Sequence, residues 1–479
     1  MNRACQFFSV STLRRRASLS ALLQLVAVLL ILNATNSLAA SLLVGVAETD
    51  ITPERPVHLI NQLTAKESEG VHQRLKAKAL VFRDPQSKSK STCVLIAFDG
   101  IGVPPQVTAE VRKRLAPRIP PQNVTVCATH DHCAPHLTGL LPGIFGDALP
   151  EAHQRRIDEY TKRLVDELTG VARDAVNDCR PRRLLRGTGR VQFAVNRRKV
   201  VDGRWTGWGN DPDGAVDHSL PLLCVSNPDN SVAAILVSYA CHNTSIGGRD
   251  FDNRISGDWV GYAQKSIERN HPGAIAMVTL GCAGEARPNE HGGLEAARRF
   301  GDVIAGEVSR LTSTKLPEIT TPPTCRLNLT RLSLSPPPPP SKLPALAQTA
   351  ATARSRAAKA HARIAADLLK QSEFDQAVPL ALDYPVQTWN FGSELTWVFL
   401  AGEVVVDYAH RLRREFGATV WPIAYANDLP CYIPSKRILR EGGYEADQSM
   451  VYYGRLQTLL PSTEDRIMAE LRRQLGAAR

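Results

Sequence analysis

Histidines that follow apolar segments are the first residues of this chain whose types and spacing could do chemistry. His130 and His132 lie in a polar run directly after the apolar segment at 124–128. Two histidines two residues apart can reach one cleft only if the backbone bends between them. Neutral imidazole nitrogen is a good zinc ligand, and Asp131 or another acid could support such a ligand with a hydrogen bond. A polar turn with ordinary surface histidines would explain the same spacing.

Three further apolar segments end in residues of similar kinds. His242 follows one of them, and a loop with Gly281, Gly284 and Arg287 follows the next, where glycine permits a close approach of the backbone. Glu403 lies between an apolar strand and an apolar helix. A buried carboxylate there needs a partner, a proton or a metal, although the dipole of a helix also favours an acid at its start. Two histidines and one glutamate form a ligand set typical of catalytic zinc.

The segments that must hold these residues alternate between strand-like and helix-like patterns. Apolar runs predict buried strands at 92–98, 124–128, 233–239 and 275–280, and three- and four-residue spacing predicts helices at 106–115, 153–177, 262–270 and 294–311. This alternation predicts an α/β fold with a layered, mixed sheet and flanking helices. Loops that follow strands are where α/β proteins display site residues.

The chain is expected to form one main catalytic domain with an inserted helical arm. Residues 41–332 make up the first part of the metal-binding α/β domain. Residues 333–372 are a proline-rich connection and an arm rich in Ala, Lys and Arg, which we expect to be solvated rather than to lie on a membrane. Residues 373–479 complete the domain, and strands at 386–389 and 395–400 are expected to rejoin the first sheet.

Composition narrows the class of protein. The chain has 479 residues, of which 43% are hydrophobic and 22% charged, and this excludes wholesale disorder, a coiled coil and a multi-span membrane protein. The net charge is +11, but no run of five basic residues occurs. Nucleic acid is therefore not an expected partner.

The N-terminus has the order of a secretory signal. Arg14, Arg15 and Arg16 precede an apolar stretch, and small residues follow as far as Ala40. Residues 1–40 are accordingly predicted to be a signal peptide that exports the protein to a periplasmic, secreted or cell-surface location, with an uncleaved anchor as the alternative. Of ten cysteines most are expected to be free, since no Cys-x-x-Cys spacing occurs.

The motifs, taken in order, resemble the N-terminal catalytic domain of the neutral/alkaline (non-lysosomal) ceramidase family, with this chain as a divergent member. The resemblance runs from about Val44 to Gly454. It rests on Gly45–Pro53, Ala128–Pro135, Asn196-Arg197, Val216-Asp217, Ala240–Thr244, Ser256–Gly261, Gly284–Asn289, Gly402-Glu403 and Tyr444-Glu445. Each match is weak alone, and the ordered set is specific to the superfamily.

The resemblance implies the site and its chemistry. One zinc ion per chain would be bound by His130, His242 and Glu403. His132 and Arg197 would be catalytic: both line the site, Arg197 stabilises the oxyanion, and His132 delivers a proton to the leaving amine. The implied activity is zinc-dependent hydrolysis of a linear amide, such as the N-acylsphingosine bond, in a small-molecule or lipid substrate, which is compatible with peripheral membrane contact.

Two departures bear on the substrate. Arg287 stands where the family has a serine, and Leu429 stands where it has an additional zinc-binding tyrosine, for which Tyr432 or Tyr444 could compensate. Arg287, Tyr432 and Tyr444 are the expected substrate-binding residues. An arginine near the pocket favours a carboxylate or phosphate on the substrate, unless it forms a structural ion pair with Glu285 or another acid.

Two other functions remain open on the same scaffold. One is metal-dependent hydrolysis of an ester or phosphoester, and the other is a binding protein that has lost turnover. The sequence has no Gly-x-Ser-x-Gly elbow, which disfavours a serine-lipase mechanism. It also has no His-Glu-x-x-His helix, the motif of many zinc proteases.

Overall fold

A nine-stranded mixed sheet contains the strands that precede both histidine loops. The computed structural model describes residues 42–61, 66–86, 91–116, 118–247, 252–349, 352–373 and 377–476, so the predicted signal peptide lies outside the described residues. The strand order is β10-β9-β8-β5-β1-β2-β3-β4, with β12 beside β5. These strands are β1 (Leu42–Asp50), β2 (Lys76–Arg83), β3 (Cys93–Phe98), β4 (Val124–Ala128), β5 (Arg180–Arg190), β8 (Ser219–Ser226), β9 (Val232–Tyr239), β10 (Ile275–Leu280) and β12 (Glu318–Ile319). The pairs β3–β4 and β9–β10 are parallel and the other pairs are antiparallel.

A second sheet packs face to face on the first. It has the order β13-β14-β15-β17, formed by β13 (Thr324–Ser333), β14 (Ala381–Phe391), β15 (Leu395–Leu400) and β17 (Val420–Ile423). The prediction that this late segment rejoins the first sheet is therefore wrong. Large aromatic side chains explain the difference: the rings of Trp389 and Trp397 lie 6.3 and 5.7 Å from that of Phe82 on the first sheet. Such rings fill the space between two sheets and suit face-to-face packing better than edge pairing.

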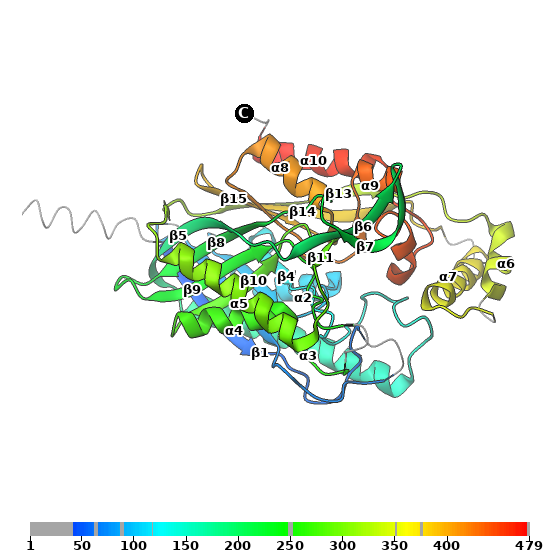
Figure 1. Cartoon of the computed structure of the whole chain (residues 1–479), viewed down its shortest axis with the longest axis horizontal. Helices are drawn as coiled ribbons and strands as arrows, with labels where there is room; N and C mark the ends of the chain where they lie inside the picture. Colours follow the sequence, from blue (N-terminus) through cyan, green and yellow to red (C-terminus); the bar gives the residue numbers. More distant parts are fainter. Residues whose placement is uncertain are drawn as a thin grey trace, which may run out of the picture. The chain divides into compact units, whose positions relative to one another are not determined.

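Helices cover the outer faces of both sheets (Figure 1). Four of them, α2 (Pro105–Leu115), α3 (Glu151–Asn177), α4 (Asp258–Asn270) and α5 (Gly293–Thr312), pack on the large sheet, and α8 (Val406–Phe416) and α10 (Ser462–Leu475) pack on the small one. The result is a four-layer arrangement of helix, sheet, sheet and helix. The predicted class, a mixed α/β fold with flanking helices, is confirmed. Leu42–Arg479 form one compact unit.

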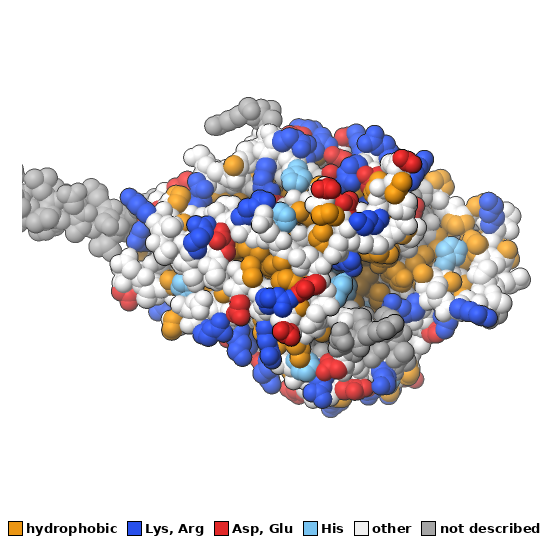
Figure 2. Space-filling model, viewed as in Figure 1, with side chains coloured by type: hydrophobic (Ala, Val, Ile, Leu, Met, Phe, Trp, Pro, Cys, Tyr) orange, Lys and Arg blue, Asp and Glu red, His pale blue; other side chains and the backbone are white. Residues whose placement is uncertain are grey.

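The inserted arm consists of two helices, α6 (Leu343–Gln348) and α7 (Arg356–Glu373), after a short 3-10 turn, η3 (Pro340–Lys342). It is less solvated than predicted, because Ala360, Ala362 and Ala365 on α7 are fully buried. Figure 2 shows a hollow lined by hydrophobic side chains beside this arm, where α7 faces the 3-10 segment η5 (Gln448–Tyr453).

Small elements complete the surroundings of the site. They are the three-stranded sheet β11-β6-β7, made of β6 (Ala194–Val201), β7 (Arg204–Asp211) and β11 (Ala286–Pro288), the parallel pair β16 (Glu403–Val404) and β18 (Tyr432–Ile433), α9 (Lys436–Glu441) and η1 (Pro121–Asn123). Among the described residues, no helix combines the length and apolar character needed to cross a membrane.

Candidate metal centre

His130 lies two residues beyond the end of β4 and supplies the bend that the sequence requires. Its φ angle is 50°, in the left-handed region that residues other than glycine rarely adopt. Such strained residues gather at functional sites. Nδ1 of His130 lies 2.7 Å from the carbonyl oxygen of Ile101, which accepts its hydrogen bond. The Nε2 lone pair is thereby left to face the interior of the site.

His242 follows β9 and is held in the same way. Its Nδ1 lies 2.8 Å from the carbonyl oxygen of Ala283 and 3.1 Å from that of Ala286. Burial lowers the pKa of His242 to about 4, with a smaller contribution from nearby Arg197, and this keeps the imidazole neutral. Backbone carbonyls therefore orient both histidines, and Asp131, which was predicted as a supporting acid, accepts from the backbone nitrogen of Cys133 instead. Hydrogen-bonded imidazoles of this kind are typical of metal ligands.

Glu403 reaches the same point from β16, the short strand that follows β15 of the second sheet. It follows Gly402, whose φ of 78° allows the chain to turn after β15. Oε2 of Glu403 lies 3.1 Å from Nε2 of His130 and 3.2 Å from Nε2 of His242.

The donor set fits a metal ion. Oε2 of Glu403 is buried and receives no hydrogen bond within the described residues. With Nδ1 of each histidine donating to a carbonyl, a carboxylate oxygen and two imidazole lone pairs face one another. Buried lone pairs so close repel unless a cation lies between them, and zinc prefers this set of nitrogen and oxygen ligands. His130, His242 and Glu403 would hold the ion.

His132 is an alternative to Glu403 as the third metal ligand beside His130 and His242. Nε2 of His132 lies 3.3 Å from Nε2 of His130, and the nitrogens of His130, His132 and His242 all fall within 4.8 Å of one another. Burial, helped by the two neighbouring imidazoles, lowers the pKa of His132 well below its usual value. Within the described residues no carbonyl orients His132, which lines a cavity of about 370 Å³. It is therefore less constrained than the other two histidines.

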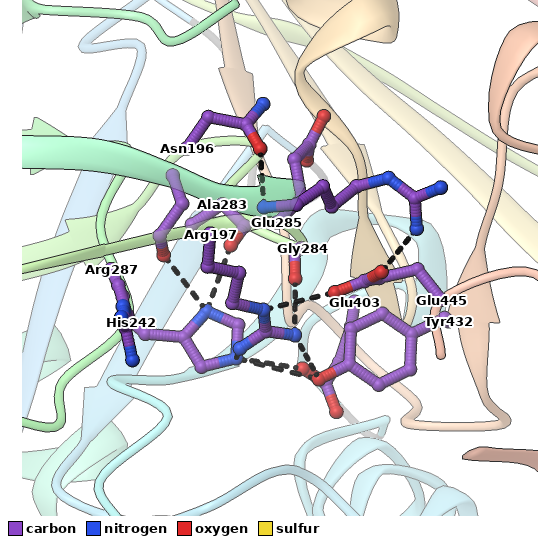
Figure 3. A network of polar contacts seen from close by, with 12 residues as sticks. Asn196, Arg197, His242, Ala283, Gly284, Glu285, Arg287, Glu403, Tyr432 and Glu445 are labelled. Atoms are coloured by element: carbon purple, nitrogen blue, oxygen red, sulfur yellow. Dashed lines mark hydrogen bonds and ion pairs between the residues drawn. The ribbon is translucent and has the colours of Figure 1, made fainter. Parts of the chain in front are cut away.

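Arg197 on β6 lies at the site, as the sequence predicts for a residue that lines it. Figure 3 shows its guanidinium against His242, with Nη1 3.1 Å from Nε2 of the histidine. Nη2 donates to the carbonyl oxygen of Gly284 at 2.8 Å, and Nε donates to Glu445 at 2.9 Å. Although burial disfavours the charge, the Tyr432 hydroxyl and the Glu445 carboxylate hold the pKa of Arg197 well above its usual value.

The structure distinguishes between Tyr432 and Tyr444, the two tyrosines that could compensate for Leu429. The hydroxyl of Tyr432 lies 3.4 Å from Nε2 of His242 and accepts a hydrogen bond from Arg197 at 2.9 Å. Tyr444 lies one ring further out, with its ring centre 5.6 Å from that of Tyr432. Leu429 is buried against Gly102 and offers no polar atom to the site. Tyr432 is thus the predicted tyrosine that reaches the histidines.

Arg287 lines the cavity beside His132, Arg197 and His242. It does not pair with Glu285, which accepts instead from the backbone nitrogen of Val406 at 3.0 Å and lies 3.7 Å from Arg437. The ion pair with Glu285, which the sequence left open for Arg287, therefore does not form.

Two further tyrosines at the site escape sequence reasoning. Tyr425 stacks on His130 with ring centres 4.3 Å apart, and Tyr453 donates its hydroxyl to Oε1 of Glu403. The available signal is weak: Gly454, with φ of 74°, marks a turn after Tyr453, and nothing in the local pattern points to a histidine or an acid.

Comparison with known proteins shows the family of this chain. The family model described as "Neutral/alkaline non-lysosomal ceramidase, N-terminal" matches residues 42–297, more than half of the chain. A neutral ceramidase of Mycobacterium tuberculosis is 29% identical over an alignment of 247 residues, and this alignment covers 47% of this chain and 36% of that protein. The matched region thus spans about a third of the length of this curated relative.

Two solved structures share the fold. The match to the structure titled "Ceramidase complexed with C2" covers 92% of this chain and 76% of that chain. The match to the crystal structure of neutral ceramidase from Pseudomonas aeruginosa covers 91% of this chain and 75% of that chain. Each has a TM-score of 0.65 and 19% sequence identity. The two structures show the mixed α/β fold of this chain. The chain belongs to the neutral/alkaline non-lysosomal ceramidase family.

Proposed function

We propose that this protein is an exported, zinc-dependent hydrolase that cleaves a linear amide bond in a lipid-like substrate of the N-acylsphingosine type. The observation that carries the metal is the buried, unpartnered Oε2 of Glu403 between His130 and His242. Membership of a ceramidase family and the neutral ceramidase relative support the amide.

A zinc ion in this site would supply Lewis acidity and make water a nucleophile near neutral pH. The chain's own groups would do the rest. Arg197, whose charge is maintained by the adjacent carboxylate of Glu445, faces the site and would stabilise negative charge on the carbonyl oxygen, an effect worth about 3 kcal/mol for one such donor. The Tyr432 hydroxyl, 3.4 Å from Nε2 of His242, is the candidate for a fourth ligand or a second donor to that oxygen.

His132 would transfer the proton to the leaving amine. Its low pKa keeps the imidazole neutral at rest, so it can take a proton as water attacks and release it when the amine departs. Because it lines the cavity and lacks a carbonyl partner, it can turn between these positions. General acid–base catalysis of this kind contributes about 10²- to 10⁴-fold.

Metal content tests the proposal first. Plasma mass spectrometry of the purified full chain should find one zinc, which both His242→Ala and Glu403→Gln should lose. His136→Gln is the matched control, because His136 is a buried histidine that packs on Phe145 rather than in the site. His132→Gln should keep the metal and lose turnover, and loss of metal there would make His132 a ligand.

Product analysis then tests the reaction. Free amine released from a panel of N-acyl amides supports the proposal. Release of alcohol or phosphate from ester or phosphoester panels would support the other hydrolase class on the same scaffold. A chain that binds no zinc after zinc is added back would be a binding protein without turnover.

Export is tested separately. Fractionation of the native host and N-terminal sequencing of the mature protein should find the chain outside the cytoplasm and starting close to Ala40, as the signal-like order of residues 1–40 predicts. A cytoplasmic chain that retains residues 1–40 would contradict this part of the proposal.

A further inference from the structure

Arg287 brings to the cavity a positive charge that no acid among the described residues balances. Of its five N–H groups, Nη2 donates one to Oδ1 of Asn210 at 2.9 Å, and Nη1 lies 3.1 Å from Nε2 of His291. Both partners are neutral. The Nε group is buried and has no acceptor within the described residues. Three of the five donors are therefore left without a partner.

The other arginine of the cavity is different. Arg197 donates to the carboxylate of Glu445, so its charge is matched inside the protein. The described residues that line the cavity include no Asp or Glu. Burial and repulsion by Arg197 lower the pKa of Arg287, which is the response of a guanidinium with no anion beside it.

The backbone fixes this charge next to the candidate metal centre. Ala286, the residue before Arg287, accepts hydrogen bonds from both the backbone nitrogen and Nδ1 of His242. Side chains alternate along β11, so Ala286 and Pro288 are buried while Arg287 turns toward the cavity. Figure 3 shows Arg287 beside His242.

The cavity wall is shaped for a bound group with an aromatic or apolar neighbour. Trp208 on β7 lines it with 47% of its surface exposed, and the guanidinium of Arg197 lies 4.7 Å from that ring. His291, which contacts Arg287, is itself held by the carbonyl oxygen of Thr244 at 2.8 Å. These contacts position Arg287 without neutralising it.

Resting on the function proposed above, we propose that the substrate carries an anionic oxygen group, a carboxylate or a phosphate, close to the scissile amide, and that Arg287 binds it. Guanidinium groups match carboxylate and phosphate geometry with paired hydrogen bonds, and the unused Nη hydrogens of Arg287 are available for them. An N-acyl amino acid or an N-acyl phosphoethanolamine has this chemistry, whereas the headgroup of ceramide is neutral.

Charge selectivity tests the proposal. The zinc-loaded full chain is assayed on N-octanoylglycine, N-octanoyl phosphoethanolamine and neutral N-octanoylethanolamine, and the first two distinguish carboxylate from phosphate. We expect kcat/KM for at least one anionic amide to exceed that for the neutral amide about tenfold or more. Loss of a charged hydrogen bond should reduce this ratio about 10- to 100-fold in Arg287→Ser, mainly through KM.

Companion variants separate binding of the anion from support of the wall. Arg287→Gln keeps a polar side chain but has no charge, so it should lose selectivity like Arg287→Ser, while Arg287→Lys should recover part of it. Arg269→Ser on α4, where the side chain is 65% exposed and pairs with Asp302, is the control and should keep the wild-type ratio. Wild-type selectivity in Arg287→Gln would overturn the proposal, and so would a wild-type enzyme that ignores charge.

A binding measurement keeps this test independent of turnover. Calorimetry on the zinc-stripped full chain should detect N-octanoylglycine or N-octanoyl phosphoethanolamine, but not N-octanoylethanolamine, and Arg287→Gln should abolish the signal. Anion binding without amine release would overturn the proposed amide hydrolysis and leave the anion site standing. Amine release without charge discrimination would support the proposed amide hydrolysis and overturn the anion site.

Discussion

Tyr453 donates a hydrogen bond to Oε1 of Glu403 across 50 residues of sequence. The bond leaves Oε2, the other carboxylate oxygen, directed at His130 and His242. Supporting bonds of this kind fix which oxygen of a carboxylate faces a metal.

Tyr453→Phe should therefore weaken zinc binding by about 10- to 100-fold, because a buried Oε1 loses its donor and the carboxylate can rotate. Titration against a competing chelator measures this affinity. Tyr452→Phe is the matched control, since Tyr452 is the adjacent tyrosine and contacts the ring of Tyr444 rather than Glu403. Equal affinity in wild type and Tyr453→Phe would show that the bond does not orient Glu403.

Gly284→Ala should disturb the site through the backbone. A Cβ atom at this position would lie 2.8 Å from the carbonyl oxygen of Glu403. Overpacking typically costs about 1–3 kcal/mol, and here the strand that carries Glu403 would have to move. Thermal unfolding and zinc content, measured together, should both fall.

Gly306→Ala should raise stability rather than lower it, and it serves as the control for Gly284→Ala. Gly306 lies within α5, and an added Cβ would meet no atom within 4 Å. Alanine should stabilise the helix by about 0.5–1 kcal/mol and leave zinc content at the wild-type level. A destabilised Gly306→Ala or an unaffected Gly284→Ala would contradict the packing described here.

The zinc-stripped protein should lose stability as the pH falls. Burial lowers the pKa of His136 to about 4, whereas an unfolded chain takes up the proton near pH 6.5. Between these values the unfolded state binds more protons, so acidification favours unfolding. Urea unfolding at pH 7.5 and 4.5 should show a loss that is smaller in His136→Leu by on the order of 2 kcal/mol. If the wild-type protein and His136→Leu lost the same stability between pH 7.5 and 4.5, a group other than His136 would be the one protonated on unfolding.

Cys93 and Cys325 should form a disulfide under oxidising conditions. Their sulfur atoms lie 3.2 Å apart, one on β3 and the other on β13, although the cysteines of the described residues are free in the structure. Each thiol would give up a hydrogen to an oxidant such as oxidised glutathione, so intact mass should fall by about 2 Da. The link should add about 2–4 kcal/mol to stability. Cys325→Ser should show neither change, and a reduced pair after oxidation would contradict the prediction.

Local pattern predicts much of this fold because the first sheet is built from continuous apolar runs. The predicted strand at 275–280 has the bounds of β10, and the predicted helix at 153–177 lies inside α3. The placement of His130 and His242 in loops after strands follows from the same signal. The bend at His130 could be anticipated as well, since two histidines so close cannot otherwise share a cleft.

Contacts between the two sheets could not be predicted in this way. The segment that contains Trp389 and Trp397 has the pattern of buried strands, and that pattern does not distinguish pairing at a sheet edge from packing on its face. Tyr425, two residues after β17, reaches the site because of this packing. Arg287 was predicted at the pocket, but its choice of Asn210 over Glu285 depends on the position of β7.

The two sheets also supply the candidate ligands separately, and this has a mechanical consequence. His130 and His242 follow strands of the large sheet, whereas Glu403 follows β15 of the small one. An ion held by all three would fasten one layer to the other, so that sliding the sheets apart would require breaking a coordination bond. Metal binding would then slow proteolysis at places far from the cavity. The two histidines would stabilise the whole α/β domain as well as take part in its chemistry.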